Sequence, residues 1–353
     1  MNTGDHNPPA LRRVLAPLAT LYGGAVALRN RYCDTFAFAT HAARLPVISV
    51  GNVSVGGTGK TPLVIEIVRR LRASGRRPAI LTRGYAAKRG QTADEVLEYA
   101  LAVPETPVVV NPDRTAGAET ARLEYGADCV VLDDGFQHRW LRRDLDIVVI
   151  DALDPWGGQR LLPEGRLREP LHNLARADWF VISRINQAPP QRVAEIVETL
   201  RRFAPHAPIS KAAVAAEGLS GANGSAVSPE CLAQRRPLPV CGVGNPSSFL
   251  QLVQELASQA CEPLVFSDHH RYGMRDVERI LAAAAQQRAD LVVTTRKDWV
   301  KLHALWPATR NGAHVAELQR LDARLVLADA RGDFAARLER LFEEQCERRH
   351  SGL

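Results

Sequence analysis

The feature that most constrains this chain is a glycine-rich segment at residues 54–61, which follows a short apolar run at residues 47–50. The segment reads Ser-Val-Gly-Gly-Thr-Gly-Lys-Thr, and an amphipathic pattern continues from Leu63 to Leu71. In a strand, loop and helix of this kind, main-chain N–H groups and the helix N-terminus face bound phosphates. The pattern therefore favours a phosphate-binding loop over a glycine-rich turn before an ordinary helix.

The residue types in the loop have expected tasks. Lys60 is expected to reach the terminal phosphates of ATP, and the Thr61 hydroxyl to hold Mg²⁺. Pro62 suits the first helical turn, where its missing N–H is not needed. Ser54 stands where the usual motif has glycine, so the match is imperfect. The predicted ATP-binding residues are Ser54, Val55, Gly56, Gly57, Thr58, Gly59, Lys60 and Thr61.

Acidic residues end two later apolar runs. The run at 129–132 ends in Asp133 and Asp134, and the run at 145–150 ends in Asp151. In phosphate-loop enzymes an acid at a strand end positions Mg²⁺. The sequence favours the pair over the single acid for this role. Strand-like and helix-like segments alternate, which predicts an α/β fold with a parallel sheet covered by helices on both faces.

Other polar residues follow the strand predicted at 78–82. Arg83 lies at its carboxyl end, where ligands of an open α/β sheet bind. Asp94 and Glu95 come just before a short helical run, and from local spacing they most simply cap that helix.

The length of 353 residues allows two domains. A stretch rich in Gly, Ser, Asn, Ala and Pro predicts a domain boundary. We expect an N-terminal helix at 1–35, a nucleotide-binding domain at 36–215, a linker at 216–237 and a smaller α/β domain at 238–353. In that last domain Asp268, His269 and His270 follow a predicted strand. An Asp–His pair beside an interdomain cleft is a candidate for chemistry.

The N-terminal segment has apolar residues at helical spacing from Leu11 to Leu28, flanked by four arginines. A transmembrane helix needs about 20 apolar residues, and this run is shorter and contains Pro17. A signal peptide fits the pattern but not an ATP-dependent enzyme. An amphipathic helix on an anionic membrane surface and a helix packed on the protein core remain equally compatible with the periodicity.

Composition narrows the partners further. The net charge of +6 suits an anionic partner, but the chain shows no aromatic-basic stripe that would indicate nucleic-acid binding. The six cysteines form no C-x-x-C pair, so we interpret them as reduced thiols and not as a zinc site or a disulfide framework.

Taken together, these motifs resemble the tetraacyldisaccharide 4′-kinases, the lipid A 4′-kinase family. The resemblance covers nearly the whole chain, and its most specific block is Asp-Asp-Gly-Phe-Gln-His at residues 133–138. The other matching segments lie at residues 50–62, 82–85, 94–95, 167–170, 242–246, 268–270 and 294–298. The chain departs from the family pattern at Ala93, Val96, Glu164, Arg166 and Arg296.

The resemblance implies transfer of the ATP γ-phosphate to the 4′-hydroxyl of tetraacyldisaccharide 1-phosphate, with ATP and Mg²⁺ as cofactors. It implies a peripheral enzyme on the cytoplasmic face of the inner membrane, bound to the lipid substrate and an anionic surface, with no obligate protein partner. It also turns Asp94 from a cap into the expected base, assisted by His269, and favours the membrane surface for the N-terminal helix. Glu169 becomes a further expected metal ligand, and the remaining candidates are Arg83, Glu95, His138, Asp268 and His270.

A membrane-associated P-loop NTPase switch, or a metallochaperone-like ATPase, is the alternative function. Many such proteins carry a lysine at the position of Val55, which crosses a dimer interface. Because this chain has valine there, the sequence disfavours a dimer-activated switch.

Overall fold

The computed structural model describes residues 9–36, 40–84, 94–222, 224, 226–307, 309–310, 313–314, 316–328 and 332–350. Its contacts divide the chain into two compact units. The first unit contains residues 1–86, 99–213 and 325–353, and the second contains residues 87–98 and 214–324. Tyr85 and Ala93, which belong to the motifs above, lie outside the described residues.

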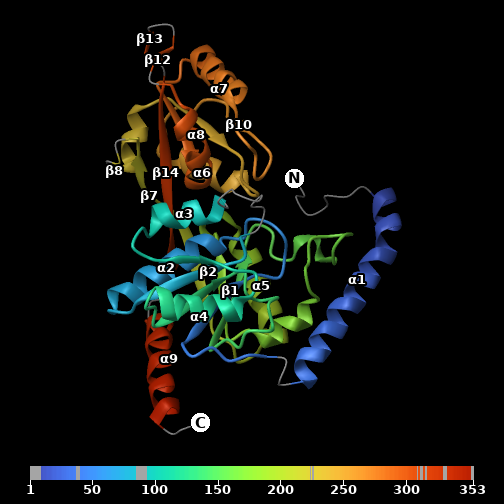
Figure 1. Cartoon of the computed structure of the whole chain (residues 1–353). Helices are drawn as coiled ribbons and strands as arrows, with labels where there is room; N and C mark the ends of the chain where they lie inside the picture. The colour runs from blue at the N-terminus through green and yellow to red at the C-terminus, as the bar shows by residue number, and fades with distance from the viewer. Residues whose placement is uncertain are drawn as a thin grey trace. The chain divides into compact units, whose positions relative to one another are not determined.

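The first unit is built on a parallel sheet (Figure 1). Its strand order is β7-β6-β5-β1-β4-β2-β3, and each adjacent pair runs parallel. The central strands are buried along their whole length, as expected when helices cover both faces of a parallel sheet. The strands are β1 (Val47–Gly51), β2 (Pro78–Thr82), β3 (Val108–Val110), β4 (Cys129–Asp133), β5 (Leu145–Asp151), β6 (Trp179–Ser183) and the start of β7 (Ile209–Ser220).

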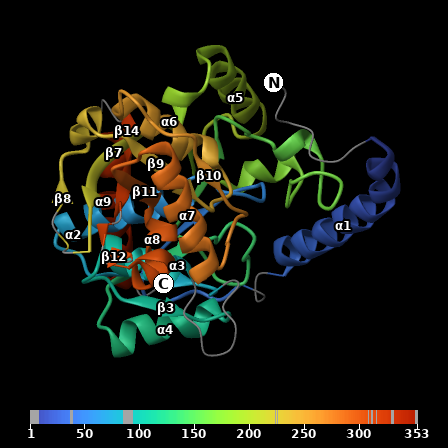
Figure 2. The ribbon, with the colours of Figure 1, turned by 90° about the horizontal axis from the view of Figure 1, so that it is seen from above.

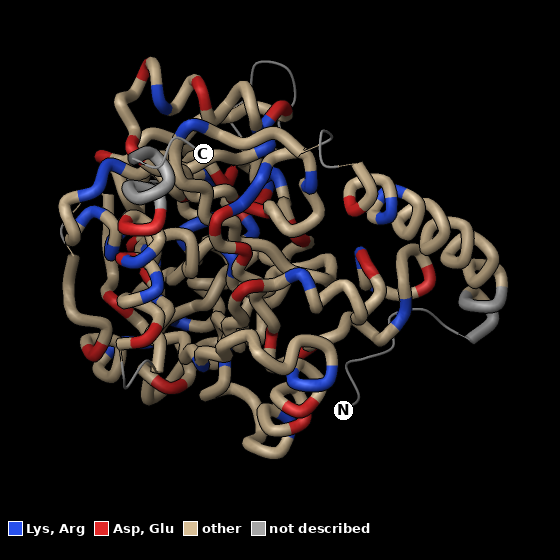
Figure 3. The backbone as a smooth tube through the Cα atoms, turned by 90° about the horizontal axis from the view of Figure 1, so that it is seen from below, with Lys and Arg blue, Asp and Glu red and all other residues tan. Residues whose placement is uncertain are grey.

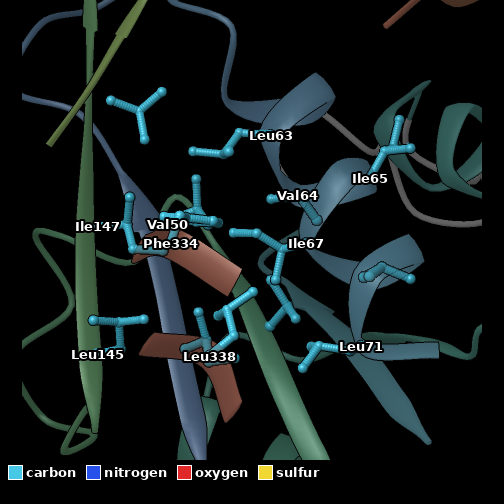
Figure 4. Close-up of a cluster of buried hydrophobic side chains, with 14 of the residues drawn as sticks. Val50, Leu63, Val64, Ile65, Ile67, Leu71, Leu145, Ile147, Phe334 and Leu338 are labelled. Atoms are coloured by element: carbon cyan, nitrogen blue, oxygen red, sulfur yellow. The ribbon is translucent and has the colours of Figure 1, made fainter. Parts of the chain in front are cut away.

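Helix α2 shows how this unit is held together. Its apolar residues Leu63, Ile67 and Leu71 recur at helical spacing and are buried in one cluster with strands β1 and β5. Phe334 and Leu338 of the last helix enter the same cluster (Figure 4). The helices of this unit are α1 (Pro9–Thr35), α2 (Lys60–Ala73), α4 (Arg114–Glu124), α5 (Pro190–Phe203) and α9 (Asp333–His350). It also has the short 3₁₀ helices η2 (Gly157–Gln159), η3 (Leu171–Arg176) and η4 (Ile185–Gln187).

The second unit has a smaller sheet, with strand order β10-β9-β11-β14-β7. Strands β10, β9, β11 and β14 pair in parallel. Helix α3 (Asp94–Ala102) begins in this unit and ends in the first. The other elements are β8 (Ala226–Val227), η5 (Pro229–Gln234), β9 (Pro237–Cys241), α6 (Pro246–Leu256), β10 (Leu264–Val265), α7 (Met274–Gln287), β11 (Leu291–Thr295), α8 (Arg296–Leu302), η6 (His303–Leu305), β12 (Thr309–Arg310), β13 (Ala313–His314) and β14 (Glu317–Ala328).

This division differs from the predicted domains. The helix predicted as a separate part at 1–35 belongs to the first unit, and residues 94–98, predicted in the nucleotide-binding domain, belong to the second. The predicted linker at 216–237 contains the end of β7, β8 and η5, all in the second unit. Helix α9, predicted in the C-terminal domain, belongs to the first unit because its apolar face packs against α2 and Trp179. The sequence pattern located this helix but did not reveal which core receives it.

The role of α9 can be tested by truncating a buried leucine. Leu341 is fully buried in the first unit's core, so Leu341→Ala should lower the free energy of unfolding by about 2–5 kcal/mol. Leu123→Ala, at a leucine that is 64% exposed on α4, is the matched control and should change it by less than about 0.5 kcal/mol. Urea denaturation measures both variants. Equal, small effects would show that α9 does not belong to this core.

Candidate active site

The loop at residues 54–61 is shaped by two glycines with left-handed backbone. Gly56 has φ 129° and Gly59 has φ 91°, conformations that cost glycine little. Gly59 caps α2, which begins at Lys60. Ser54 is not among the residues with positive φ, so this position does not require the glycine of the usual motif. The departure at Ser54 therefore leaves the loop geometry intact.

Lys60 lies in a network of polar side chains at the ends of β1 and β4. Its Nζ is 3.2 Å from Asn52 Oδ1 and 3.3 Å from Asp134 Oδ1. Arg168 donates from Nη1 to both Asp134 oxygens, at 2.8 and 2.6 Å. Two cations thus converge on one carboxylate beside the phosphate loop. Asp134 itself has φ 54°, a strained conformation of the kind that clusters at functional sites.

The two adjacent acids differ in electrostatic environment. Asp133 pairs in register with Val50 of β1, and burial together with the charge of Asp134 raises its pKa. Burial also acts to raise the pKa of Asp134, but Lys60 and Arg168 outweigh it and lower the value to about 2. Asp133 Oδ1 is buried without a hydrogen-bond donor in the described part of the chain. This oxygen is therefore suited to accept a cation.

Ser183, the last residue of β6, and Arg184, the next residue, hold the phosphate loop in place. Ser183 Oγ donates to the carbonyl of Thr58 at 2.8 Å, and Arg184 Nη2 donates to the carbonyl of Gly57 at 2.7 Å. Arg184 Nη1 also contacts Asp151 Oδ2 at 2.5 Å, and both side chains are largely buried. Asp151, the rival for the Mg²⁺ role, is thus an anchor for the arginine that holds the loop.

Glu169 occupies a different environment from the one predicted. Its carboxylate is fully buried and accepts from Arg29 and Asn30 of α1, Asn173 and Arg176. The expected metal role would require the cation to replace part of this set. Among the described residues, no three His, Cys, Asp or Glu side chains form a protein-only metal site.

The second unit brings together the predicted Asp–His pair. His269 Nδ1 is 3.5 Å from Asp94 Oδ2. Lys301 Nζ lies 3.3 Å from the same Asp94 oxygen, and Lys297 Nζ lies 2.9 Å from Asp268 Oδ1. Asp94 and His269 are separated in sequence by about half of the chain, yet they form one contact in the second unit, as a base and its orienting partner must.

The remaining candidates are less directly placed. His270 Nε2 lies 3.2 Å from Asp276 Oδ2, and its ring packs against Phe266 and Tyr272, which indicates a structural role. Burial and the charges of Arg114 and Arg143 lower the pKa of His138 to about 4. Arg83 is exposed at the end of β2, and Glu95 is half-buried beside Asp94.

The departure at Arg296 is accommodated in the second unit. The guanidinium is buried and contacts Asp322 Oδ1 at 2.8 Å, with Glu217 at 3.8 Å. The departure at Arg166 forms an ion pair with Asp154. Both substitutions have carboxylate partners, so neither leaves a buried charge uncompensated.

Comparison with known proteins decides the family. The sequence pattern described as tetraacyldisaccharide-1-P 4′-kinase, LpxK, matches residues 11–342. The chain belongs to the tetraacyldisaccharide-1-P 4′-kinase family. The predicted family resemblance is thereby confirmed.

Relatives in this 4′-kinase family match over most of their length. The tetraacyldisaccharide 4′-kinase of Anaeromyxobacter sp. (strain Fw109-5) is 37% identical, with 95% of this chain and 97% of the relative covered. That of Halothermothrix orenii is 34% identical, with 82% of each chain covered. The crystal structure of LpxK from Aquifex aeolicus in complex with ATP matches with TM-score 0.71 and 28% identity, covering 95% of this chain and 99% of that one. The α/β fold of a P-loop kinase, with its N-terminal helix, is confirmed.

Several polar residues of this 4′-kinase site were not identified as site residues from sequence. Asn52 contacts Lys60, Arg184 braces the loop, and Lys301 contacts Asp94. Asn52 lies in the Val-Gly-Asn segment before the loop, which was a usable signal. Arg184 and Lys301 are joined to their partners only by tertiary folding, so no local pattern marks them.

The two acid sites make separable predictions. Asp133→Asn and Asp134→Asn should each raise the Mg²⁺ concentration needed for half-maximal ATP turnover, with at least one severe loss, because the cation loses a carboxylate. Asp151→Asn is the matched control and should act mainly on ATP affinity, through Arg184. A Mg²⁺ titration of all three folded variants checks this. A severe Mg²⁺ defect for Asp151→Asn, with mild effects at the other two, would reverse the assignment.

Proposed function

We propose that this protein is an ATP-dependent kinase that phosphorylates the 4′-hydroxyl of tetraacyldisaccharide 1-phosphate. The product is the 1,4′-bisphosphate precursor of lipid A. The observation that carries the proposal is the Lys60–Asp134–Arg168 network beside the phosphate loop, in a chain whose full-length relatives are named for this reaction. The ATP complex of the Aquifex aeolicus relative supports ATP as the donor.

Residues of the first unit fit the donor half of the reaction. Lys60 neutralises charge on the γ-phosphate once it exchanges its contact with Asp134 for the nucleotide. Thr61, Asp133 and Asp134 are the residues that would hold Mg²⁺. Bound there, Mg²⁺ would add to this charge neutralisation. The unpartnered Asp133 Oδ1 is the observation that supports the fit.

Residues of the second unit fit the acceptor half. The 4′-hydroxyl must lose a proton as it attacks, and Asp94 is the proposed acceptor of that proton. His269 orients the carboxylate from 3.5 Å, and Lys301 contacts it from 3.3 Å. Helix α3 carries Asp94 in the second unit and the buried Tyr99 in the first, so one helix connects the two halves.

An NTPase switch is the weaker proposal. Val55, at the position where such switches carry a dimer-crossing lysine, is partly exposed and apolar. A switch hydrolyses ATP without an acceptor alcohol, whereas the Asp94–His269 pair supplies a base for one.

Helix α1 supports a membrane-surface location. Ala19, Val26 and Cys33 of one face are buried against the first unit, whereas Val14, Leu18, Leu21 and Leu28 of another are exposed, with Leu21 and Leu28 each at 71%. No charged residue lies between Val14 and Leu28, and Figure 3 shows this part of α1 in tan. The sequence left two possibilities for this segment, a helix packed on the protein core and an amphipathic helix on a membrane surface. In the structure one face of α1 is buried and another is apolar and exposed.

Aromatic side chains extend this apolar face. The rings of Tyr32 and Phe36 lie tilted against each other at the end of α1, with centroids 4.9 Å apart, and the Trp140 ring lies 6.0 Å from that of Tyr32. All three side chains are exposed. Tyrosine and tryptophan suit a membrane interface, where one end of the ring is apolar and the other is hydrated. No described helix is both long and apolar enough to cross a bilayer. The exposed apolar face of α1 and these aromatic rings support a peripheral position on a membrane surface, which the family resemblance puts on the cytoplasmic face of the inner membrane.

The base assignment predicts a specific kinetic defect. In an assay with purified disaccharide 1-phosphate, ATP turnover should depend on the acceptor. Asp94→Asn should lower kcat by roughly 10²–10⁴-fold with ATP affinity little changed, because shape is kept but basicity is lost. Glu95→Gln is the neighbouring control and should be mild. Acceptor-independent ATP hydrolysis would favour the switch, and a large loss only at Glu95 would transfer the role of base to that residue.

The membrane assignment predicts a loss of vesicle binding. Replacing Leu18, Leu21 and Leu28 together with serine should reduce sedimentation with anionic vesicles, because the outer face loses apolar area. Leu123→Ser, at an exposed leucine of α4, is the control. Point substitutions are preferable to deleting residues 1–30, since Tyr22 and Arg29 contact Arg168 and Glu169. Unchanged sedimentation of the triple variant would contradict surface binding through α1.

A further inference from the structure

His269 is surrounded by three charged side chains from separate parts of the second unit. Asp94 of α3 faces Nδ1 at 3.5 Å. Lys297 of α8 faces Nε2 at 3.3 Å, and Asp268 Oδ2 is also nearest to Nε2 but at 3.9 Å. Helix α8, which carries Lys297, lies beside α7 of the same unit (Figure 2). The imidazole therefore meets a carboxylate at one nitrogen and an ammonium at the other.

These neighbours restrict the proton on the ring. An ammonium group only donates hydrogen bonds, so the nitrogen that faces it must offer a lone pair. An ionised carboxylate only accepts, so the nitrogen that faces it must carry the proton. The opposite neutral tautomer would set Nε2–H against the ammonium and a lone pair against the Asp94 carboxylate. The Asp268 oxygen is too distant from Nε2 to compensate with a hydrogen bond.

We propose that Lys297 is a positioning residue that keeps the ring proton of His269 on Nδ1, from which the ring donates to Asp94. The inference rests on the proposed function of Asp94 as base, and it adds what His269 does for that base. The imidazole orients the carboxylate and takes no proton from the substrate. This assigns a task to the Thr-Arg-Lys-Asp segment at residues 295–298, which the reaction scheme above does not use.

The surroundings hold Lys297 and His269 in place. Lys297 Nζ is fixed by Asp268 Oδ1 at 2.9 Å, and its side chain is 17% exposed. Burial acts to raise the pKa of Asp268, but the Lys297 contact outweighs it and lowers the value, so Asp268 stays ionised. His269 has φ 57°, and its N–H donates to Asp268 Oδ1 at 3.0 Å. The left-handed backbone and this hydrogen bond fix the direction of the ring.

The other lysine of α8 has a different task. Lys301 contacts Asp94 Oδ2, Asp298 Oδ1 and the carbonyl of His270, and no contact joins it to the His269 ring among the described residues. It balances the charge of Asp94, whereas Lys297 acts on the imidazole. Removing Lys297 would take away the ammonium that requires a lone pair on Nε2, so Nε2 could then carry the ring proton.

Nitrogen NMR of the full chain with ¹⁵N-labelled histidine side chains tests this directly. His269→Asn identifies the His269 signals by their loss among the ten histidines. At neutral pH the wild type should show a protonated Nδ1 and an unprotonated Nε2. In Lys297→Met a signal of protonated Nε2 should appear, because no ammonium then requires a lone pair there, and Lys297→Arg should restore the wild-type pattern. Lys211→Met, at an exposed lysine of β7, should leave the signals unchanged.

Kinetics then separates this inference from the proposed function. Lys297→Met should lower kcat with little change in KM for ATP, by less than the roughly 10²–10⁴-fold expected for the base itself, and Lys297→Arg should recover most of it. A wild-type ring protonated on Nε2, or a ring unaffected by Lys297→Met, overturns the inference even if Asp94→Asn is inactive. The expected tautomer together with an active Asp94→Asn variant would instead reject Asp94 as the base and leave the ring assignment standing.

Discussion

The charge network of Lys60, Asp134 and Arg168 is the interaction on which the rest of the first unit depends. A lysine that binds phosphate must point into the site before the nucleotide arrives, and Asp134 contacts Lys60 from 3.3 Å. Arg168 supplies a second cation, so the carboxylate remains ionised with a pKa of about 2. The neighbouring Asp133 has the opposite shift because it is buried. The pKa values of the adjacent acids Asp133 and Asp134 therefore shift in opposite directions, because burial dominates at one and nearby cations dominate at the other.

The same network extends to the N-terminal helix. Tyr22 of α1 donates to the carbonyl of Arg168 at 2.9 Å, and Arg29 pairs with the buried Glu169 at 2.8 Å. The inner face of α1 therefore holds the segment whose arginine binds Asp134, while its outer face is apolar and exposed. A helix that only anchored the protein would not need these polar contacts. Helix α1 thus connects an exposed apolar surface with the segment that carries Arg168.

Local patterns predicted the elements well, and tertiary partners poorly. The strand predicted at 78–82 has the observed bounds of β2, and the apolar runs at 47–50, 129–132 and 145–150 lie within β1, β4 and β5. The phosphate loop was readable because glycine, lysine and threonine act within one segment. Glu169 could be placed beside Arg168, but its burial by Arg29, 140 residues earlier in the chain, could not. The Arg184–Asp151 ion pair and the packing of α9 into the first unit's core could likewise not be predicted from local sequence patterns.

The central claim is that phosphate passes to one oxygen of a lipid disaccharide. The most direct measurement is ³¹P NMR of the product formed from tetraacyldisaccharide 1-phosphate, ATP and Mg²⁺ with purified wild-type protein, with Lys60→Met as the inactive comparison. The account predicts a second phosphomonoester signal coupled to the 4′ proton of the sugar, absent with Lys60→Met. Free phosphate as the only new signal, or a monoester at another position, would contradict it.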